Sequence, residues 1–127
     1  MALIVVADDE YLLAVMLADI LENEGHEVVI ASHGLDALER IRARRPVLVI
    51  TDFMMPLMTG LELARAIKAD QEIADLPIIL TSGAQGAIGR QHGELFAAVL
   101  DKPYKNEVLL AIVNGILADA SDAKETN

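Results

Sequence analysis

Short apolar runs alternate with longer segments of helical periodicity along the chain. The runs at 3–7, 28–31, 47–50, 78–80 and 96–100 are aliphatic and rich in β-branched residues, which is typical of strands buried on both faces of a sheet. Segments with helical spacing lie between them, at 11–23, 35–44, 60–69 and about 105–118. This alternation predicts an α/β fold, in which right-handed βαβ units build an open parallel sheet with helices on both faces.

The region of the fourth expected helix is unusually rich in glycine. Half of the eight glycines of the chain fall within eleven residues there: Gly83, Gly86, Gly89 and Gly93. Each glycine inside a helix costs up to about 1 kcal/mol relative to alanine. We therefore expect a short, distorted or mobile helix, and a plain loop is the alternative.

The length of 127 residues fits one domain, which we place at 1–120, followed by a polar tail at 121–127 that we expect to be disordered. A formal net charge of −10 repels phosphate backbones and anionic lipid, so neither nucleic acid nor a membrane surface is an expected partner. The first residues lack the pattern of a signal peptide, and no run approaches the roughly 18 apolar residues of a membrane span. With no cysteine in the chain, these features predict a cytoplasmic protein.

Polar residues follow four of the five expected strands. Ligands of open parallel α/β sheets bind beyond the carboxyl ends of the strands. The polar residues at those ends are Asp8, Asp9 and Glu10; Thr51 and Asp52; Thr81 and Ser82; and Asp101 and Lys102. Any one of them has a structural explanation, since an Asp after a strand is commonly a helix N-cap. Their convergence on one edge predicts a functional site.

Asp8, Asp9 and Asp52 would lie close together at this edge. Two unit charges about 4 Å apart repel by about 4 kcal/mol at an effective dielectric constant near 20, so the cluster requires a cation. A site made of oxygen ligands favours Mg²⁺ or Mn²⁺.

A carboxylate held beside such a cation can attack a phosphoryl group in line and form an acyl phosphate. In this arrangement Asp52 is the nucleophile. The ammonium group of Lys102 and the hydroxyl of Thr81 would neutralise the oxygens that the cation does not reach.

These residues resemble the receiver domain of two-component response regulators. The segments that carry the resemblance are VVADDE at 5–10, DFMMPLMTG at 52–60, LPIILTSG at 76–83 and DKPY at 101–104. The resemblance implies a doubly wound, flavodoxin-like five-stranded parallel sheet of order 2-1-3-4-5.

The resemblance also implies roles for individual residues. Asp52 would be the phosphoacceptor, and Asp8 and Asp9 would bind Mg²⁺ together with Asp52 and the backbone carbonyl of Met54. Thr81 and Lys102 would contact the phosphoryl group. A cis peptide between Lys102 and the proline that follows is implied as well.

The implied donor is a phosphohistidine on a separate histidine kinase or histidine phosphotransfer protein, and the signal would pass to a downstream protein by direct contact. The domain would act on its own phosphorylation and would not be an enzyme for other substrates. No histidine of this chain is required, so His26, His33 and His92 are expected at the surface.

Two departures from the family pattern fall on the face that usually transmits the signal. Val99 stands where receivers usually carry a Tyr or Phe that moves inward as the Thr closes on the phosphate. The glycine-rich segment replaces a regular fourth helix. Our hypothesis is that Thr81 still responds to the phosphoryl group and that ordering of residues 83–93 is the readout.

Two other functions use the same residues. A phosphohydrolase of the haloacid dehalogenase type would need a second Asp two residues after the nucleophile, where this chain has Met54. A receiver-like module that is not phosphorylated would act by constitutive interaction or dimerisation. The apolar segment 108–118 fits either close packing on the first helix or a surface for a homodimer or partner.

Overall fold

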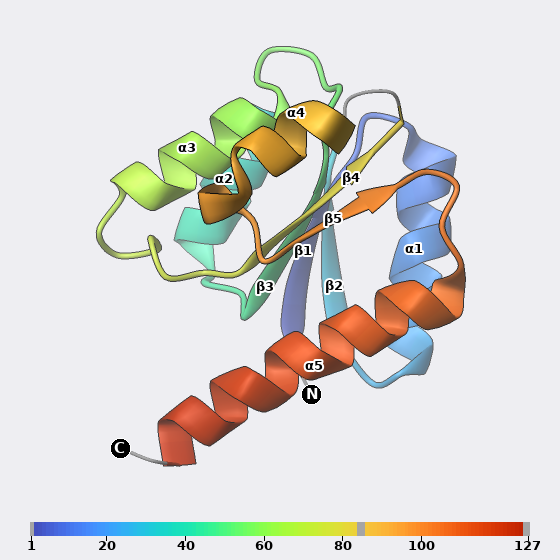
Figure 1. Cartoon of the computed structure of the whole chain (residues 1–127), viewed down its shortest axis with the longest axis vertical. Helices are drawn as coiled ribbons and strands as arrows, with labels where there is room; N and C mark the ends of the chain where they lie inside the picture. The colour runs from blue at the N-terminus through green and yellow to red at the C-terminus, as the bar shows by residue number, and fades with distance from the viewer. Residues whose placement is uncertain (1, 84–85, 126–127) are drawn as a thin grey trace.

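The structure is a computed structural model that describes residues 2–83 and 86–125. Strands and helices alternate along the chain (Figure 1). In order they are β1 (Leu3–Ala7), α1 (Tyr11–Asn23), β2 (Glu27–Ala31), α2 (Gly34–Ala43), β3 (Leu48–Asp52), α3 (Gly60–Ala69), β4 (Ile78–Ser82), α4 (Gly86–Gln91), the 3₁₀ turn η1 (Gly93–Leu95), β5 (Ala98–Asp101) and α5 (Asn106–Glu125).

The five strands form one parallel sheet of order β2-β1-β3-β4-β5, so the predicted fold class and strand order are confirmed. β3 and β4 each run two residues past their predicted ends, because the ladder continues through the pairs Thr51 with Leu80 and Asp52 with Thr81. Polar residues that end these strands are thus part of the sheet. Their positions are fixed by backbone hydrogen bonds.

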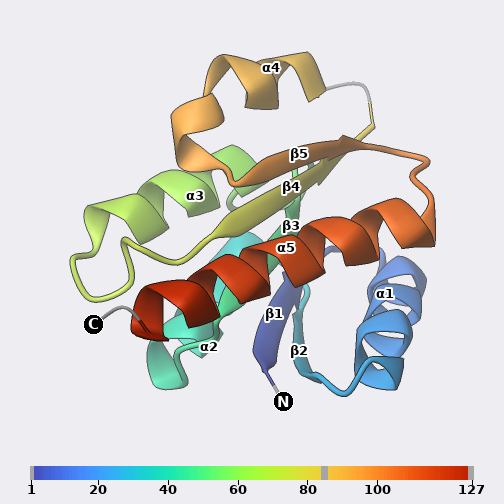
Figure 2. The same ribbon diagram turned by 60° about the horizontal axis from the view of Figure 1, so that its bottom comes forward.

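Helices cover both faces of the sheet, with α1 and α5 on one face and α2, α3 and α4 on the other (Figure 2). Side chains of a strand alternate between faces. On β3, Val49 therefore joins the core beneath α2 and α3, whereas Ile50 joins the core beneath α1 and α5. The sheet is buried on both sides, which accounts for the nearly continuous apolar runs in the sequence.

The β3–α3 connection folds back tightly onto the end of β3. Thr59 and Glu62 form a capping box that starts α3. Gly60 then donates its backbone N–H to the carbonyl of Phe53 at 2.8 Å. A Cβ atom at Gly60 would overlap the carbonyl oxygen of Asp52, so glycine is required here by close approach of the backbone.

Gly60→Ala is expected to lower the free energy of unfolding by about 1–3 kcal/mol, because the added methyl group must displace backbone rather than a flexible side chain. The matched control is Gly115→Ala in α5, where a Cβ atom meets nothing within 4 Å. There the better helix propensity of alanine should raise stability by up to about 1 kcal/mol. Urea unfolding of both variants measures the difference. An unchanged free energy of unfolding in Gly60→Ala would contradict the close approach of the backbone.

α5 is longer than predicted and continues to Glu125, past the expected end at Ala118. No glycine or proline follows Gly115, and the last turns contain alanine, lysine and glutamate, which favour helix. The helix thus extends into 121–125 of the tail that we expected to be disordered, and 126–127 lie outside the described residues. Within the described part of the chain, no helix is both long and apolar enough to cross a membrane.

α4 is short, as the glycine content predicts, with six residues followed by the turn η1. Its glycines serve close packing, because a Cβ atom on Gly89 would lie 2.5 Å from Cδ2 of Leu80 and 3.4 Å from Cγ1 of Val99. The backbone of α4 thus rests directly on β4 and β5. Arg90 links the same helix to the end of β5 through an ion pair of 2.7 Å with Asp101.

Candidate functional site

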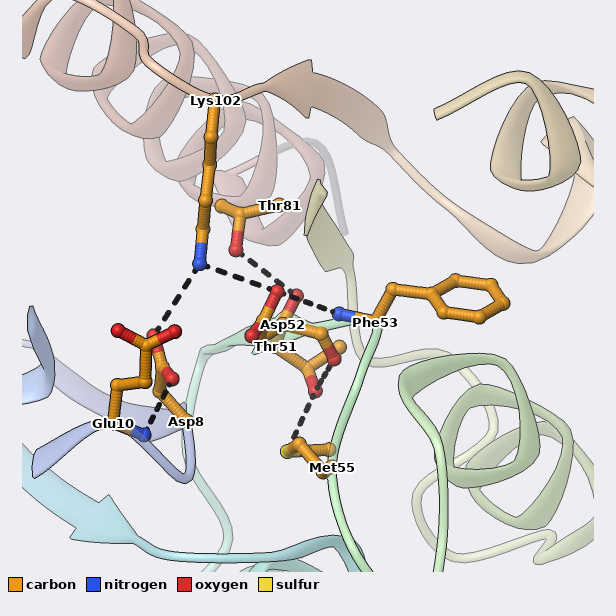
Figure 3. Close-up of polar contacts among 8 residues, drawn as sticks. All are labelled: Asp8, Glu10, Thr51, Asp52, Phe53, Met55, Thr81 and Lys102. Atoms are coloured by element: carbon orange, nitrogen blue, oxygen red, sulfur yellow. Dashed lines mark hydrogen bonds and ion pairs between the residues drawn. The ribbon is translucent and has the colours of Figure 1, made fainter. Parts of the chain in front are cut away.

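The carboxyl ends of β1, β3, β4 and β5 bring the predicted polar residues together (Figure 3). Asp52 ends β3 and pairs with Thr81 on β4. Asp8 directly follows β1, and Lys102 directly follows β5. Asp8, Asp52 and Lys102 are far apart in sequence but lie together at one edge of the sheet, as their positions at the ends of parallel strands predict.

Three carboxylates form the acidic part of the site. Asp8, Asp9 and Asp52 each offer one oxygen, and these oxygens lie within 4.8 Å of one another. Asp8 and Asp52 are buried, whereas Asp9 is exposed. Burial raises the pKa of Asp8, partly offset by the backbone N–H of Glu10 and by the Lys102 ammonium group. The folded chain therefore disfavours the charge on Asp8.

This donor set fits a hard divalent cation. All three ligating atoms are carboxylate oxygens, and neither nitrogen nor sulfur is among them. Mg²⁺ is held in proteins by one or two carboxylates and keeps several waters. The arrangement therefore suits Mg²⁺ or Mn²⁺. Met54, whose carbonyl is the further predicted ligand, lies two residues after Asp52 with its side chain 56% exposed.

Lys102 is the cationic group of the site. Its Nζ lies 3.3 Å from Oδ1 of Asp52 and 3.7 Å from Oδ2 of Asp8. The Lys102–Pro103 peptide is cis, as predicted. Burial lowers the pKa of Lys102, but the Asp52 and Asp8 carboxylates outweigh it and the net pKa is raised. The side chain is therefore a fixed positive charge next to the Asp52 carboxylate.

Asp52 and Thr81 differ in how firmly they are held, because Asp52 pairs with Lys102 whereas Thr81 makes one long hydrogen bond. Oδ1 of Asp52 accepts the backbone N–H of Phe53 at 2.9 Å. The Thr81 hydroxyl donates to the carbonyl of Thr51 at 3.5 Å, which is long for an O–H···O bond. The hydroxyl therefore loses little by turning toward another acceptor. Thr81 is 4% exposed, so this rotation would take place in a buried setting.

Val99 lies on β5 opposite Leu80, on the face that α4 covers. A Cβ atom on Gly89 of α4 would overlap the Leu80 side chain and touch that of Val99, so the helix backbone lies directly against both. Val99, Leu80 and Gly89 are thus parts of one packing arrangement.

The three histidines are partly buried rather than fully exposed. His33 has a structural role, because its Nδ1 accepts the backbone N–H of Asp36 at 3.1 Å and caps α2. None of the three belongs to the group of acids that could hold a cation.

A cavity of about 550 Å³, which the sequence pattern did not predict, opens beside Asp52. It lies between α1 and the loop that joins β5 to α5, and Tyr104 of that loop lines it. Burial raises the pKa of Tyr104. The available signal was the composition of α1, where apolar residues occupy more than the one face that the core requires.

Comparisons with known proteins support the fold described above. The family model for the response regulator receiver domain matches residues 4–114. PilH of Pseudomonas aeruginosa is 31% identical over 120 residues, which cover 93% of this chain and 99% of that protein. The DNA-binding response regulator MtrA of Mycobacterium tuberculosis is 32% identical over 121 residues, and this match covers 94% of the chain but only 52% of MtrA. A solved receiver domain protein from Clostridium thermocellum superposes with a TM-score of 0.86 at 26% identity, covering 95% of this chain and 98% of that one.

Proposed function

The chain belongs to the response regulator receiver domain family, and on that premise we propose that Asp52 accepts a phosphoryl group from a phosphohistidine of a partner protein. The observation that carries the proposal is the position of the Lys102 ammonium group, 3.3 Å from the Asp52 carboxylate and beside the oxygens of Asp8 and Asp9. A nucleophile, a cation site and a fixed positive charge are thus assembled around one carboxylate. This is the set that phosphoryl transfer to an aspartate requires.

In the proposed step, a carboxylate oxygen of Asp52 attacks phosphorus in line. The bond between phosphorus and the imidazole nitrogen of the donor breaks, and the imidazole leaves as a neutral base or takes a proton. Lys102 neutralises charge on one equatorial oxygen, and Thr81 donates a hydrogen bond to another. Asp8, Asp9, Asp52 and the Met54 carbonyl would hold Mg²⁺, which when bound supplies Lewis-acid neutralisation of a further oxygen.

The donor we propose is a histidine kinase or histidine phosphotransfer protein, and the domain would act where such kinases use ATP, in the cytoplasm. A phosphohydrolase on foreign substrates is disfavoured because Met54 replaces the acid–base carboxyl that such turnover needs. The test is transfer of labelled phosphate from each histidine kinase of the host to the chain and to a variant without the Asp52 carboxylate. Absence of labelling by every donor and by acetyl phosphate would refute the proposal.

We propose α4 as the element that reads out the phosphoryl group. α4 rests on β4 through Gly89, and β4 carries Thr81, so a shift of the threonine toward phosphate reaches the helix by direct packing. The predicted ordering of 83–93 falls partly on 84–85, which lie outside the described residues. The proposal therefore rests on 86–93.

Beryllofluoride, a phosphoryl mimic, is expected to slow amide exchange in α4 by about tenfold, the effect of about 1.4 kcal/mol of added local stability. Hydrogen–deuterium exchange measures this, and the amides of α2, on the same face of the sheet but away from the site, provide the internal control. Thr81→Ala should lose the response. Equal protection of α2 and α4, or a full response in Thr81→Ala, would contradict this readout.

A further inference from the structure

The cavity beside the acceptor has two chemically different parts. One wall carries the phosphorylation site, with Asp8, Asp52, Thr81 and Lys102. The remainder is mostly apolar and is lined by Leu13, Met16, Leu17, Ile20, Pro103 and Tyr104. At about 550 Å³ it falls within the range of small-molecule sites, which combine an apolar lining with a few convergent polar groups.

Phosphoryl transfer does not account for the apolar part. A phosphoryl group and a hydrated cation need oxygen and nitrogen partners, which the polar wall already supplies. Leu13 is 39% exposed and Met16 is 61% exposed, although both line the cavity. Large apolar side chains left facing a concave space gain free energy when an apolar group covers them.

The charge of the polar wall selects the kind of molecule. Two carboxylates, of Asp8 and Asp52, face one ammonium group, of Lys102, so the wall carries a net charge of about −1. Asp9 adds a further carboxylate beside them, and the chain as a whole carries −10. An anionic amphiphile is repelled from this site, whereas a cation is attracted.

We propose that this cavity binds a small hydrophobic amine. The aliphatic part lies against Leu13 and Met16 of α1 and against Tyr104, and the ammonium group pairs with the carboxylates of Asp8 and Asp52. The amine and a divalent cation then compete for the same two carboxylates. Such a ligand would hold the domain in a form without metal that cannot take up phosphate.

The probe is n-octylamine, titrated into chain labelled at its leucine and methionine methyl groups and followed by NMR in the absence of Mg²⁺. Saturable shifts are expected for the methyl groups of Leu13, Met16 and Leu17, and none for Leu35, which is exposed on α2. Sodium octanoate should give no saturable shift, and 1-octanol should bind at least about tenfold more weakly than the amine. Equal binding of the amine and octanoate, or no saturation, would overturn the proposal.

Competition provides the second measurement. Mg²⁺ at ten times its dissociation constant should raise the apparent dissociation constant of octylamine by about tenfold, the mass-action result for a shared site. Potassium chloride at equal ionic strength is the control, since screening alone also weakens a charged pair. An equal effect of the two salts would refute the shared carboxylates.

Two neighbouring leucines offer a matched pair of variants. Leu13 lines the cavity, whereas Leu12 is 77% exposed and does not. Leu13→Asn should lower the affinity for octylamine at least about tenfold, and Leu12→Asn should leave that affinity unchanged. Met16→Gln, which nearly preserves side-chain volume, should also weaken binding. If Leu12→Asn and Leu13→Asn lower the affinity for octylamine equally, the amine binds on the outer surface of α1 and the proposal is overturned.

A second copy of the chain is the alternative occupant. Sedimentation would then show a mass that rises with concentration and falls when octylamine is added, and this result would overturn the amine site. All binding measurements use the unphosphorylated chain without a donor. They therefore fail or succeed independently of phosphorylation at Asp52.

Discussion

A chain carrying Asp52→Asn is expected to lose nearly all uptake of phosphoryl groups from a phosphorylated histidine kinase and from acetyl phosphate. The amide is not a nucleophile at neutral pH, and we propose that the other carboxylates of the site, Asp8 and Asp9, hold the cation rather than accept phosphate. Loss of a nucleophile typically costs far more than loss of a supporting group, so the initial rate of labelling should fall at least about 10³-fold. Incorporation of labelled phosphate measures this rate.

The control is Asp19→Asn, which removes an exposed carboxylate from α1 and should label at the rate of the unmodified chain. Hydroxylamine should release the label, because an acyl phosphate reacts with it and the phosphate ester of a serine or threonine does not. Label that persists in Asp52→Asn, or that resists hydroxylamine, would mean that another residue is the acceptor. Thermal unfolding of both variants establishes that each is folded.

The sheet could be predicted because its apolar runs are compatible with few structures other than buried strands. Runs such as 3–7 and 47–50 are short, β-branched and followed by helical periodicity, which leaves a parallel sheet as the arrangement that buries both faces. The prediction ended β3 and β4 too early because it followed hydrophobicity. Thr51 and Asp52 remain in the ladder although they are polar, since neighbouring backbone groups satisfy their side chains. The Thr51 hydroxyl donates to the carbonyl of Asp52, and the Asp52 carboxylate accepts the backbone N–H of Phe53.

The site could be predicted because parallel strands place their carboxyl ends at one edge. Position at the end of a strand was enough to predict that four side chains lie together: Asp8, Asp52, Thr81 and Lys102. The three-dimensional relation of Arg90 to Asp101 was not predictable in the same way. It depends on how closely α4 approaches β5, which Gly86 and Gly89 permit but do not specify.

The cavity and the length of α5 show where sequence patterns lose information. The cavity depends on the separation of α1 from the β5–α5 loop, a tertiary distance that periodicity does not encode. The apolar residues 108–118 were open to two interpretations, and Leu109 and Val113 pack on the sheet in one core with Leu17 of α1. The helix continues past Ala118 because no stop signal follows, and polarity alone does not end a helix.

The second large effect we expect is stabilisation by Mg²⁺. At one hundred times its dissociation constant, a ligand that binds only the folded chain adds about 2.7 kcal/mol to the free energy of unfolding. For a domain of this size that raises the thermal midpoint by roughly 10 °C. Differential scanning calorimetry in MgCl₂, with KCl at equal ionic strength as the control, separates ion binding from screening.

The Asp8→Asn variant and the unmodified chain should exchange their order of stability between EDTA and MgCl₂. The pKa of Asp8 is raised by burial, so the folded carboxyl holds its proton more tightly than the unfolded one. At neutral pH both forms are ionised, and the buried charge therefore lowers stability. In EDTA the Asn variant is expected to be at least as stable as the unmodified chain, because its amide oxygen can still accept the backbone N–H of Glu10.

In MgCl₂ the unmodified chain should become the more stable of the two, because Asp8→Asn removes one of the three carboxylates that could hold the ion. Asp70→Asn is the matched control. At the surface, Asp70 pairs with Arg42 at 3.1 Å and accepts the backbone N–H of Glu72 at 3.0 Å, which an amide oxygen can also accept, so the change in stability should be less than about 1 kcal/mol in either buffer. Equal stabilisation of Asp8→Asn and the unmodified chain by Mg²⁺ would place the ion elsewhere. If the unmodified chain is the less stable of the two in EDTA and the more stable in MgCl₂, a cation bound at Asp8 offsets the cost of burying the charge of that carboxylate.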